Sequence, residues 1–152
     1  MNKIKLSDLI EAIEFHSDEY HSFIDLKKNQ MCFFSDSALS CAEDNDDNYP
    51  AWQEEEIQAA KSYLDDNSHF LALPSQYDVN EYGMMEDFVY TLDNDHQKES
   101  LLIALQGKGA FRRFKDMAIH LGLEKEWYHF RDEQYKRFVL DWCKSENIKV
   151  DI

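Results

Sequence analysis

Residues 107–122 read GKGAFRRFKDMAIHLG, and this stretch decides how the C-terminal half of the chain folds. Gly107 and Gly109 precede its apolar residues, and Gly122 follows them. Between these glycines, apolar residues recur at the spacing of one helical face: Phe111, Phe114, Ala118 and Leu121. Because glycine readily adopts the left-handed conformation that ends a helix, the stretch predicts a helix with a break at either end.

The same helical spacing continues on both sides of this stretch. Upstream it predicts a helix capped by Asp78 that contains Tyr82, Met85, Val89 and Leu92. After the polar run 93–95, the spacing resumes at Leu101, Leu102 and Leu105. Downstream it predicts a long last helix, lined on one side by Trp127, Phe130, Phe138 and Trp142. The C-terminal half is therefore predicted to be a run of amphipathic helices.

The N-terminal half combines helical and β-favouring segments. Ser7 is a good N-cap for a helix that ends near Tyr20, and the Phe, Ile and Met residues of 20–34 flank a turn at 27–29, which predicts a hairpin. An acid-rich loop is expected over 40–50, and Pro50 fits the entry of a helix over 51–64. Residues 70–73 are either a third strand or a buried connector. The predicted fold class is α+β: a predominantly helical domain with a small antiparallel sheet.

The length of the chain predicts its number of domains, and the spacing of its cysteines predicts the state of their thiols. Its 152 residues, 43% of them hydrophobic and only 4 of them glycine, predict a single domain over 1–152. Cys32, Cys41 and Cys143 are widely spaced and form no Cys-x-x-Cys pair, so we expect reduced thiols in a cytoplasmic protein. No apolar run is long enough for a signal peptide or a bilayer span, and no spacing predicts a metal or a cofactor.

Charge is abundant and unevenly distributed. With 16 basic and 31 acidic residues, the net charge of −15 disfavours nucleic acid and anionic membranes as partners at long range. Residues 36–66 hold ten carboxylates and the single base Lys61, whereas residues 107–137 hold eight bases and five acids. The acidic surface is suited to a basic partner.

The quoted stretch also carries a resemblance. The run 107–116, followed by Leu121-Gly122, by the run 126–132 and by Leu140-Asp141-Trp142-Cys143, resembles bacterial uncharacterised protein family 0158. Residues 82 and 85–88 share this likeness, and the N-terminal helix and hairpin share it more loosely. That family is defined by sequence, so the resemblance carries over no activity, cofactor or partner. The chain departs from usual members in its hairpin, which lacks a turn glycine, and in its acidic loop before Trp52.

A basic cluster surrounds the predicted start of the helix in the quoted stretch: Lys108, Arg112, Arg113 and Lys115, with Arg131 as a further candidate. Helix N-termini and guanidinium groups both attract phosphate, so this cluster is a candidate site for nucleic acid or a phosphorylated ligand. The helices on either side of Gly107 also resemble a helix-turn-helix. The structural alternative pairs Arg112 with Asp116 and uses Arg113 to hold either a neighbouring helix or the acidic segment of the same chain.

An acidic cluster precedes and begins the 51–64 helix: Asp44, Asp46, Asp47, Glu54, Glu55 and Glu56. Its spacing approaches that of a calcium loop but places Tyr49 where glycine is needed, so a solvated loop is favoured.

The sequence contains no catalytic motif, and an enzyme stays an open but unsupported class. We expect a non-enzymatic protein-binding or regulatory domain, in one version an inhibitor whose carboxylates imitate the phosphates of nucleic acid. The expected partner is therefore another protein, basic or itself nucleic-acid-binding. A homodimer is compatible with the high aromatic content of 14%.

Overall fold

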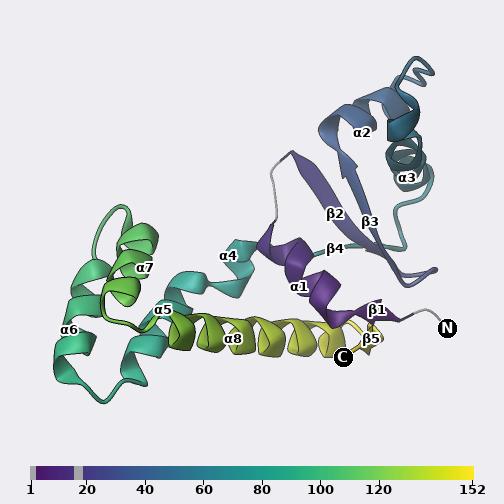
Figure 1. Cartoon of the computed structure of the whole chain (residues 1–152). Helices are drawn as coiled ribbons and strands as arrows, with labels where there is room; N and C mark the ends of the chain where they lie inside the picture. Colours follow the sequence, from purple (N-terminus) through teal and green to yellow (C-terminus); the bar gives the residue numbers. More distant parts are fainter. Residues whose placement is uncertain (1–2, 16–18) are drawn as a thin grey trace. The chain divides into compact units, whose positions relative to one another are not determined.

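The computed structural model describes residues 3–15 and 19–152 and shows a helix-rich α+β fold, as the sequence predicts (Figure 1). The chain forms two compact units. The first contains residues 1–75 and 139–152, and the second contains residues 76–138. A single domain over the whole chain stays our prediction from the sequence.

The first unit contains a three-stranded antiparallel sheet. Strands β2 (Tyr20–Asp25) and β3 (Gln30–Ser35) form the predicted hairpin, and β4 (Phe70–Ala72) pairs with β2 on its other side. The strand order is β3-β2-β4, so β3 is an edge strand. Asn29 supplies the turn with a positive φ of 51°, a conformation that asparagine tolerates better than most residues. Residues 70–73 therefore include a third strand, one of the two alternatives.

Two helices, α2 (Asp36–Glu43) and α3 (Glu54–Asp65), pack against this sheet. Their shared core is fully apolar and consists of Phe34, Ala38, Ala42, Ile57 and Ala60. The prediction of an acid-rich loop over 40–50 was wrong at its start, because residues 40–43 belong to α2. The Ser35 hydroxyl caps this helix by accepting a hydrogen bond from the Ala38 N–H. The 51–64 helix is confirmed, with its entry formed by the 3-10 turn η1 (Ala51–Gln53).

The ends of the first unit meet in a second, two-stranded sheet. Strand β1 (Ile4–Lys5) pairs in parallel with β5 (Val150–Asp151), a pairing that sequence periodicity did not predict. Helix α1 (Leu6–Glu14) follows β1 directly. Ser7 lies inside α1 and is not its N-cap, so that prediction was wrong. The predicted extension toward Tyr20 was also wrong, because α1 ends at Glu14 and β2 begins at Tyr20, while residues 16–18 lie outside the described part.

The second unit is helical. It contains α4 (Gln76–Val79), α5 (Glu81–Tyr90), α6 (Asp95–Ala104), α7 (Ala110–His120) and the first part of α8 (Glu124–Ser145). Its aromatic core joins α5, α7 and α8, with ring centroids 5.0 Å apart for Phe114 and Trp127 and 5.5 Å apart for Phe88 and Trp127. The predicted cap at Asp78 was wrong, because the Asn80 side chain accepts from the Gly83 N–H at the start of α5.

Glycine ends the helices of this unit where the sequence predicts. Gly107, Gly109 and Gly122 all have φ between 72° and 75°, which explains the breaks before and after α7. The buried stripe of α8 is shifted from the predicted one and consists of Trp127, Tyr135, Val139 and Cys143. Phe130, Phe138 and Trp142 are only partly buried. Within residues 3–15 and 19–152, no helix has both the length and the apolar character that a bilayer crossing requires.

Candidate functional site

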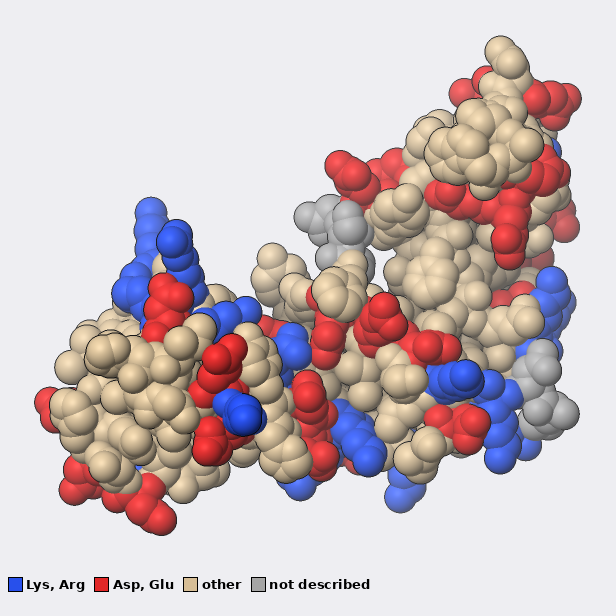
Figure 2. All heavy atoms as spheres, in the orientation of Figure 1, with Lys and Arg blue, Asp and Glu red and all other residues tan. Residues whose placement is uncertain are grey.

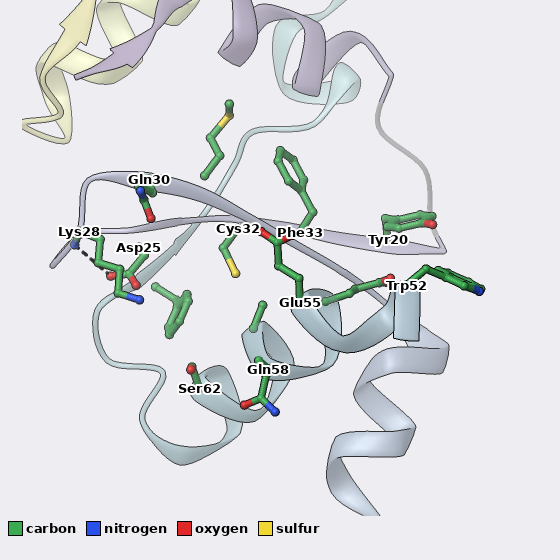
Figure 3. A pocket seen from close by; sticks show the side chains of 14 residues that line it. Tyr20, Asp25, Lys28, Gln30, Cys32, Phe33, Trp52, Glu55, Gln58 and Ser62 are labelled. Atoms are coloured by element: carbon green, nitrogen blue, oxygen red, sulfur yellow. Dashed lines mark hydrogen bonds between the residues drawn. The ribbon is translucent and has the colours of Figure 1, made fainter. Parts of the chain in front are cut away.

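A groove of about 700 Å³ lies between β3 and α3 in the first unit (Figure 3). Strand β3 contributes residues 30–33 to one wall, and α3 contributes Glu55, Glu56, Gln58, Ala59 and Ser62 to the other. Figure 3 shows Tyr20 and Trp52 at one end of this groove and Asp25, Lys28 and Gln30 at the other. We call this feature the β3–α3 groove.

The β3 wall of the groove presents unpaired backbone. The Asp36 N–H donates to the Glu19 carbonyl at 3.0 Å, which fixes the alternation of hydrogen bonds between β2 and β3. By that alternation, Cys32 directs its N–H and C=O toward β2, whereas Met31 and Phe33 direct theirs away. In the described part of the chain, the outward groups of Met31 and Phe33 have no hydrogen-bond partner. The free edge of β3 therefore borders the groove.

Large aromatic side chains of this region are exposed to solvent. Trp52 is 75% exposed, Tyr20 48% and Phe33 41%. All three line the β3–α3 groove. Exposed aromatic surface on a folded chain is characteristic of binding sites, because removing it from water is favourable.

The carboxylates of the acidic cluster divide into two groups. Three have local structural partners. The Asp46 carboxylate accepts from the Asn48 N–H at 2.9 Å, Glu54 accepts from the Tyr49 hydroxyl at 2.5 Å, and Glu56 accepts from the Ser35 N–H at 2.5 Å. The hydrogen bonds from Tyr49 and Gln58 lower the pKa of Glu54, so this carboxylate stays ionised.

The remaining three carboxylates, Asp44, Asp47 and Glu55, are exposed. Their side chains make no hydrogen bond or ion pair within the part of the chain that the structure describes. Figure 2 shows carboxylates gathered on the surface that α2 and α3 form. Glu55 is the unpartnered member that lines the β3–α3 groove.

One cysteine, Cys32, lines the groove but is poorly suited to act as a nucleophile. Burial raises the pKa of its thiol, the nearby Asp25 raises it further, and Lys28 opposes this effect. Because the thiolate is the reactive form, a raised pKa keeps Cys32 protonated at neutral pH. Among the described residues, no three side chains of His, Cys, Asp or Glu are grouped to hold a metal ion. The groove thus combines a free strand edge, exposed aromatic side chains and the exposed carboxylate of Glu55.

The basic cluster is divided by the structure. Arg113 lies on α7 and donates to three backbone carbonyls: Ala104 at 3.2 Å, Gln106 and Lys108. These carbonyls belong to the end of α6 and the turn that follows it, so Arg113 holds α6 to α7. This arrangement corresponds to the structural alternative, in which Arg113 holds a neighbouring helix.

Arg131 is also engaged, because its guanidinium pairs with Glu81 at 2.5 Å and lies 4.5 Å from the centroid of the Tyr135 ring. Arg112, by contrast, has a side chain that is 91% exposed and pairs loosely with Asp116 at 3.9 Å. Lys108 and Lys115 are exposed as well. Figure 2 shows basic side chains projecting from the surface at α7. The residues of this cluster that stay available for a ligand are thus Lys108, Arg112 and Lys115.

Comparison with known proteins places the chain in a family. Over residues 1–152 it matches the model of the Uncharacterised protein family (UPF0158). The chain belongs to this family. It is similar to the UPF0158 protein PA5073 of Pseudomonas aeruginosa, with 29% identity over 68 residues that cover 44% of this chain and 44% of the relative. No solved structure matches the chain.

Residues 109–115 are the most specific part of the family resemblance. In this UPF0158 protein they hold the helices of the second unit together. Gly109 begins α7 with a left-handed φ of 75°, Phe114 enters the aromatic core, and Arg113 closes the end of α6. The sequence resemblance therefore coincides with a structural feature of the second unit.

Sequence reasoning did not identify the aromatic members of the groove. Trp52 served only as a landmark, and Phe33 was assigned to the hairpin without regard to its edge. The available signal was a tryptophan two positions before three glutamates, Glu54 to Glu56, at the polar start of a helix. The immediate neighbours of Trp52 along the chain, Ala51 and Gln53, are too small or too polar to bury an indole ring.

Proposed function

We propose that this UPF0158 protein is a non-enzymatic protein-binding domain that captures a basic partner on the acidic surface of residues 36–66. The observation that carries the proposal is the position of Trp52, a tryptophan 75% exposed at the rim of a groove whose Glu55 has no ion-pair partner in the described part of the chain. Tryptophan is enriched among the residues that dominate binding energy at protein interfaces.

Charge supports the same reading. A net charge of −15, concentrated where ten carboxylates share one lysine, attracts basic partners over a distance comparable to the Debye length. Such a field raises the rate of association and selects against acidic partners. Asp44, Asp47 and Glu55 have no ion-pair partner among the described residues, so they can form close ion pairs with a partner without first breaking an internal pair seen there.

A narrower form of the proposal makes the domain an inhibitor that acts by nucleic-acid mimicry. Its carboxylates would occupy the groove of a nucleic-acid-binding protein in place of phosphates. We place this activity in the cytoplasm, in keeping with three cysteines that are all free thiols. A partner captured through mimicry is released by competing duplex DNA, and a partner captured in another way is not.

The test is affinity capture from nuclease-treated host lysate with two matched variants. The first neutralises the unpartnered carboxylates as Asp44→Asn, Asp47→Asn and Glu55→Gln. The control makes the same change in charge on the second unit as Glu86→Gln, Asp87→Asn and Glu99→Gln, all exposed positions. We expect the first variant to lose a basic protein that the wild type and the control retain. Equal capture by all three forms would refute the proposal.

A second candidate function is binding of nucleic acid or a phosphorylated ligand at α7, with the helix-turn-helix arrangement as one form of it. It is favoured by the exposure of Lys108, Arg112 and Lys115 around the first turns of this helix. The structure dictates the variant that tests it, because Arg113 is needed for packing. Affinity for duplex DNA that falls with salt and is lost in Arg112→Ala/Lys115→Ala would support this function.

A further inference from the structure

We propose that the β3–α3 groove receives an extended segment of the partner protein, which adds to the free edge of β3 as a further strand and carries arginine side chains. This inference rests on the proposed function and specifies the mode of binding. Strand addition uses main-chain hydrogen bonds for affinity and the flanking surfaces for specificity.

The backbone of β3 supplies the first requirement. Met31 and Phe33 direct their N–H and C=O groups outward, and neither residue finds a partner in the described part of the chain. Two residues spaced by two along an edge strand present two donors and two acceptors in line. At Ser35 the same outward direction is already occupied, because the Ser35 N–H donates to Glu56. The edge of β3 that is available for pairing is therefore short and ends before Ser35, whose N–H is occupied by the Glu56 carboxylate.

The position of α3 supplies the second requirement. An added strand lies about 4.8 Å from its neighbour in the plane of the sheet. The groove, of about 700 Å³, lies beside the edge of β3 and is closed on its other side by α3 (Figure 3). Side chains of Cys32, Gln58 and Ala59 line it. A strand in this position would be covered on one face by a helix, and so its alternate side chains would be desolvated.

The charged and aromatic groups of the groove identify the partner's chemistry. Trp52 and Glu55 are exposed near one end, and Glu55 has no ion-pair partner in the described residues. A guanidinium group can stack on an indole ring and pair with a carboxylate at the same time, which a compact ammonium group does less well. Arginine on the added segment therefore fits this end better than lysine, and a glutamate there would be repelled.

The test uses fluorescein-labelled peptides of alternating arginine and valine, about ten residues long, and fluorescence anisotropy. One copy has unmodified backbone amides, one carries a methyl group on the backbone amide nitrogen of every arginine, and one carries it on the backbone amide nitrogen of every valine. A matched peptide of alternating glutamate and valine controls for charge. In a strand, alternate residues direct their amides to the same edge, so methylation of one set blocks pairing with β3 and methylation of the other does not.

Two protein variants test the same backbone hydrogen bonds by changing the β3 strand in place of the peptide. Phe33→Pro removes the outward N–H, a change that an edge strand tolerates because that group is not used in the sheet. Phe33→Val removes the aromatic ring and keeps the N–H. Circular dichroism of both variants checks the fold. The comparison of the methylated peptides uses the wild-type protein, so it still tests strand addition if Phe33→Pro does not fold.

We expect the unmodified basic peptide to bind, and only one of the two methylated copies to lose at least about tenfold in affinity. Phe33→Pro should weaken binding more than Phe33→Val. Equal binding of both methylated copies and of both variants, with binding lost on Glu55→Gln, would overturn strand addition and leave the acidic capture surface in place. Equal binding of the basic and acidic peptides, or binding of neither, would overturn this inference, and the lysate capture then decides the proposed function separately.

Discussion

Replacement of Arg113 by alanine removes the guanidinium group that connects α7 to the end of α6. Three carbonyls, those of Ala104, Gln106 and Lys108, lose a charged donor. A hydrogen bond contributes about 0.5–1.5 kcal/mol net, and two of these three are exposed, so we expect a loss of roughly 2 kcal/mol in the free energy of unfolding. For a chain of this size, that loss lowers Tm by about 4–8 °C.

The matched control is Arg112→Ala, one position away on the same helix. The Arg112 side chain is 91% exposed and its pairing distance to Asp116 is 3.9 Å, so its removal should change stability by less than about 0.5 kcal/mol. Thermal and urea denaturation followed by circular dichroism measure both variants. If Arg113→Ala and Arg112→Ala have the same midpoint, the assignment of Arg113 as the clamp between α6 and α7 is wrong.

Three further predictions follow from the contacts of single side chains. Glu81→Gln removes the carboxylate that pairs with the mostly buried Arg131 at 2.5 Å, so the free energy of unfolding should fall by roughly 2–3 kcal/mol. Urea denaturation measures this change, and an unchanged midpoint would contradict it. Burial raises the pKa of the Cys32 and Cys143 thiols above that of an exposed thiol, so the folded state holds these protons more tightly than the unfolded state. The free energy of unfolding should therefore fall as the pH rises past the pKa of an exposed thiol, and Cys143→Ala should reduce that slope. Trp52→Ala should leave Tm within about 2 °C because the ring is 75% exposed, while partner capture from lysate is lost; retained capture would remove Trp52 from the binding surface.

The sequence predicted elements wherever local signals agree with the tertiary structure. Helix α7 is bounded by glycines that must adopt positive φ, and the β2–β3 hairpin turns at an asparagine, so both were predicted close to their observed bounds. Helix α2 was missed because it buries the small residues Ala38 and Ala42, which give a weak apolar pattern beside a run of acids. Pairing of β1 with β5 was missed because two-residue strands carry no periodicity.

The site could be predicted only in part, for a different reason. The acidic residues are visible in the sequence, but the availability of each one depends on a partner elsewhere, as when Glu56 is used by the Ser35 N–H. In the same way, the sequence offered Arg113 both as a ligand-binding residue and as a structural one, and only the carbonyls at the end of α6 show that it is engaged in packing. The free edge of β3 depends on the strand order, which places β2 between β3 and β4.

The pairing of β1 with β5 has a consequence for synthesis of the protein. Ile4 is paired with Val150, so this part of the first unit cannot form until residue 150 has left the ribosome. The second unit, residues 76–138, is contiguous and can begin to fold earlier. Nascent chains stalled at increasing lengths should therefore protect α5 to α7 from proteolysis before they protect β1.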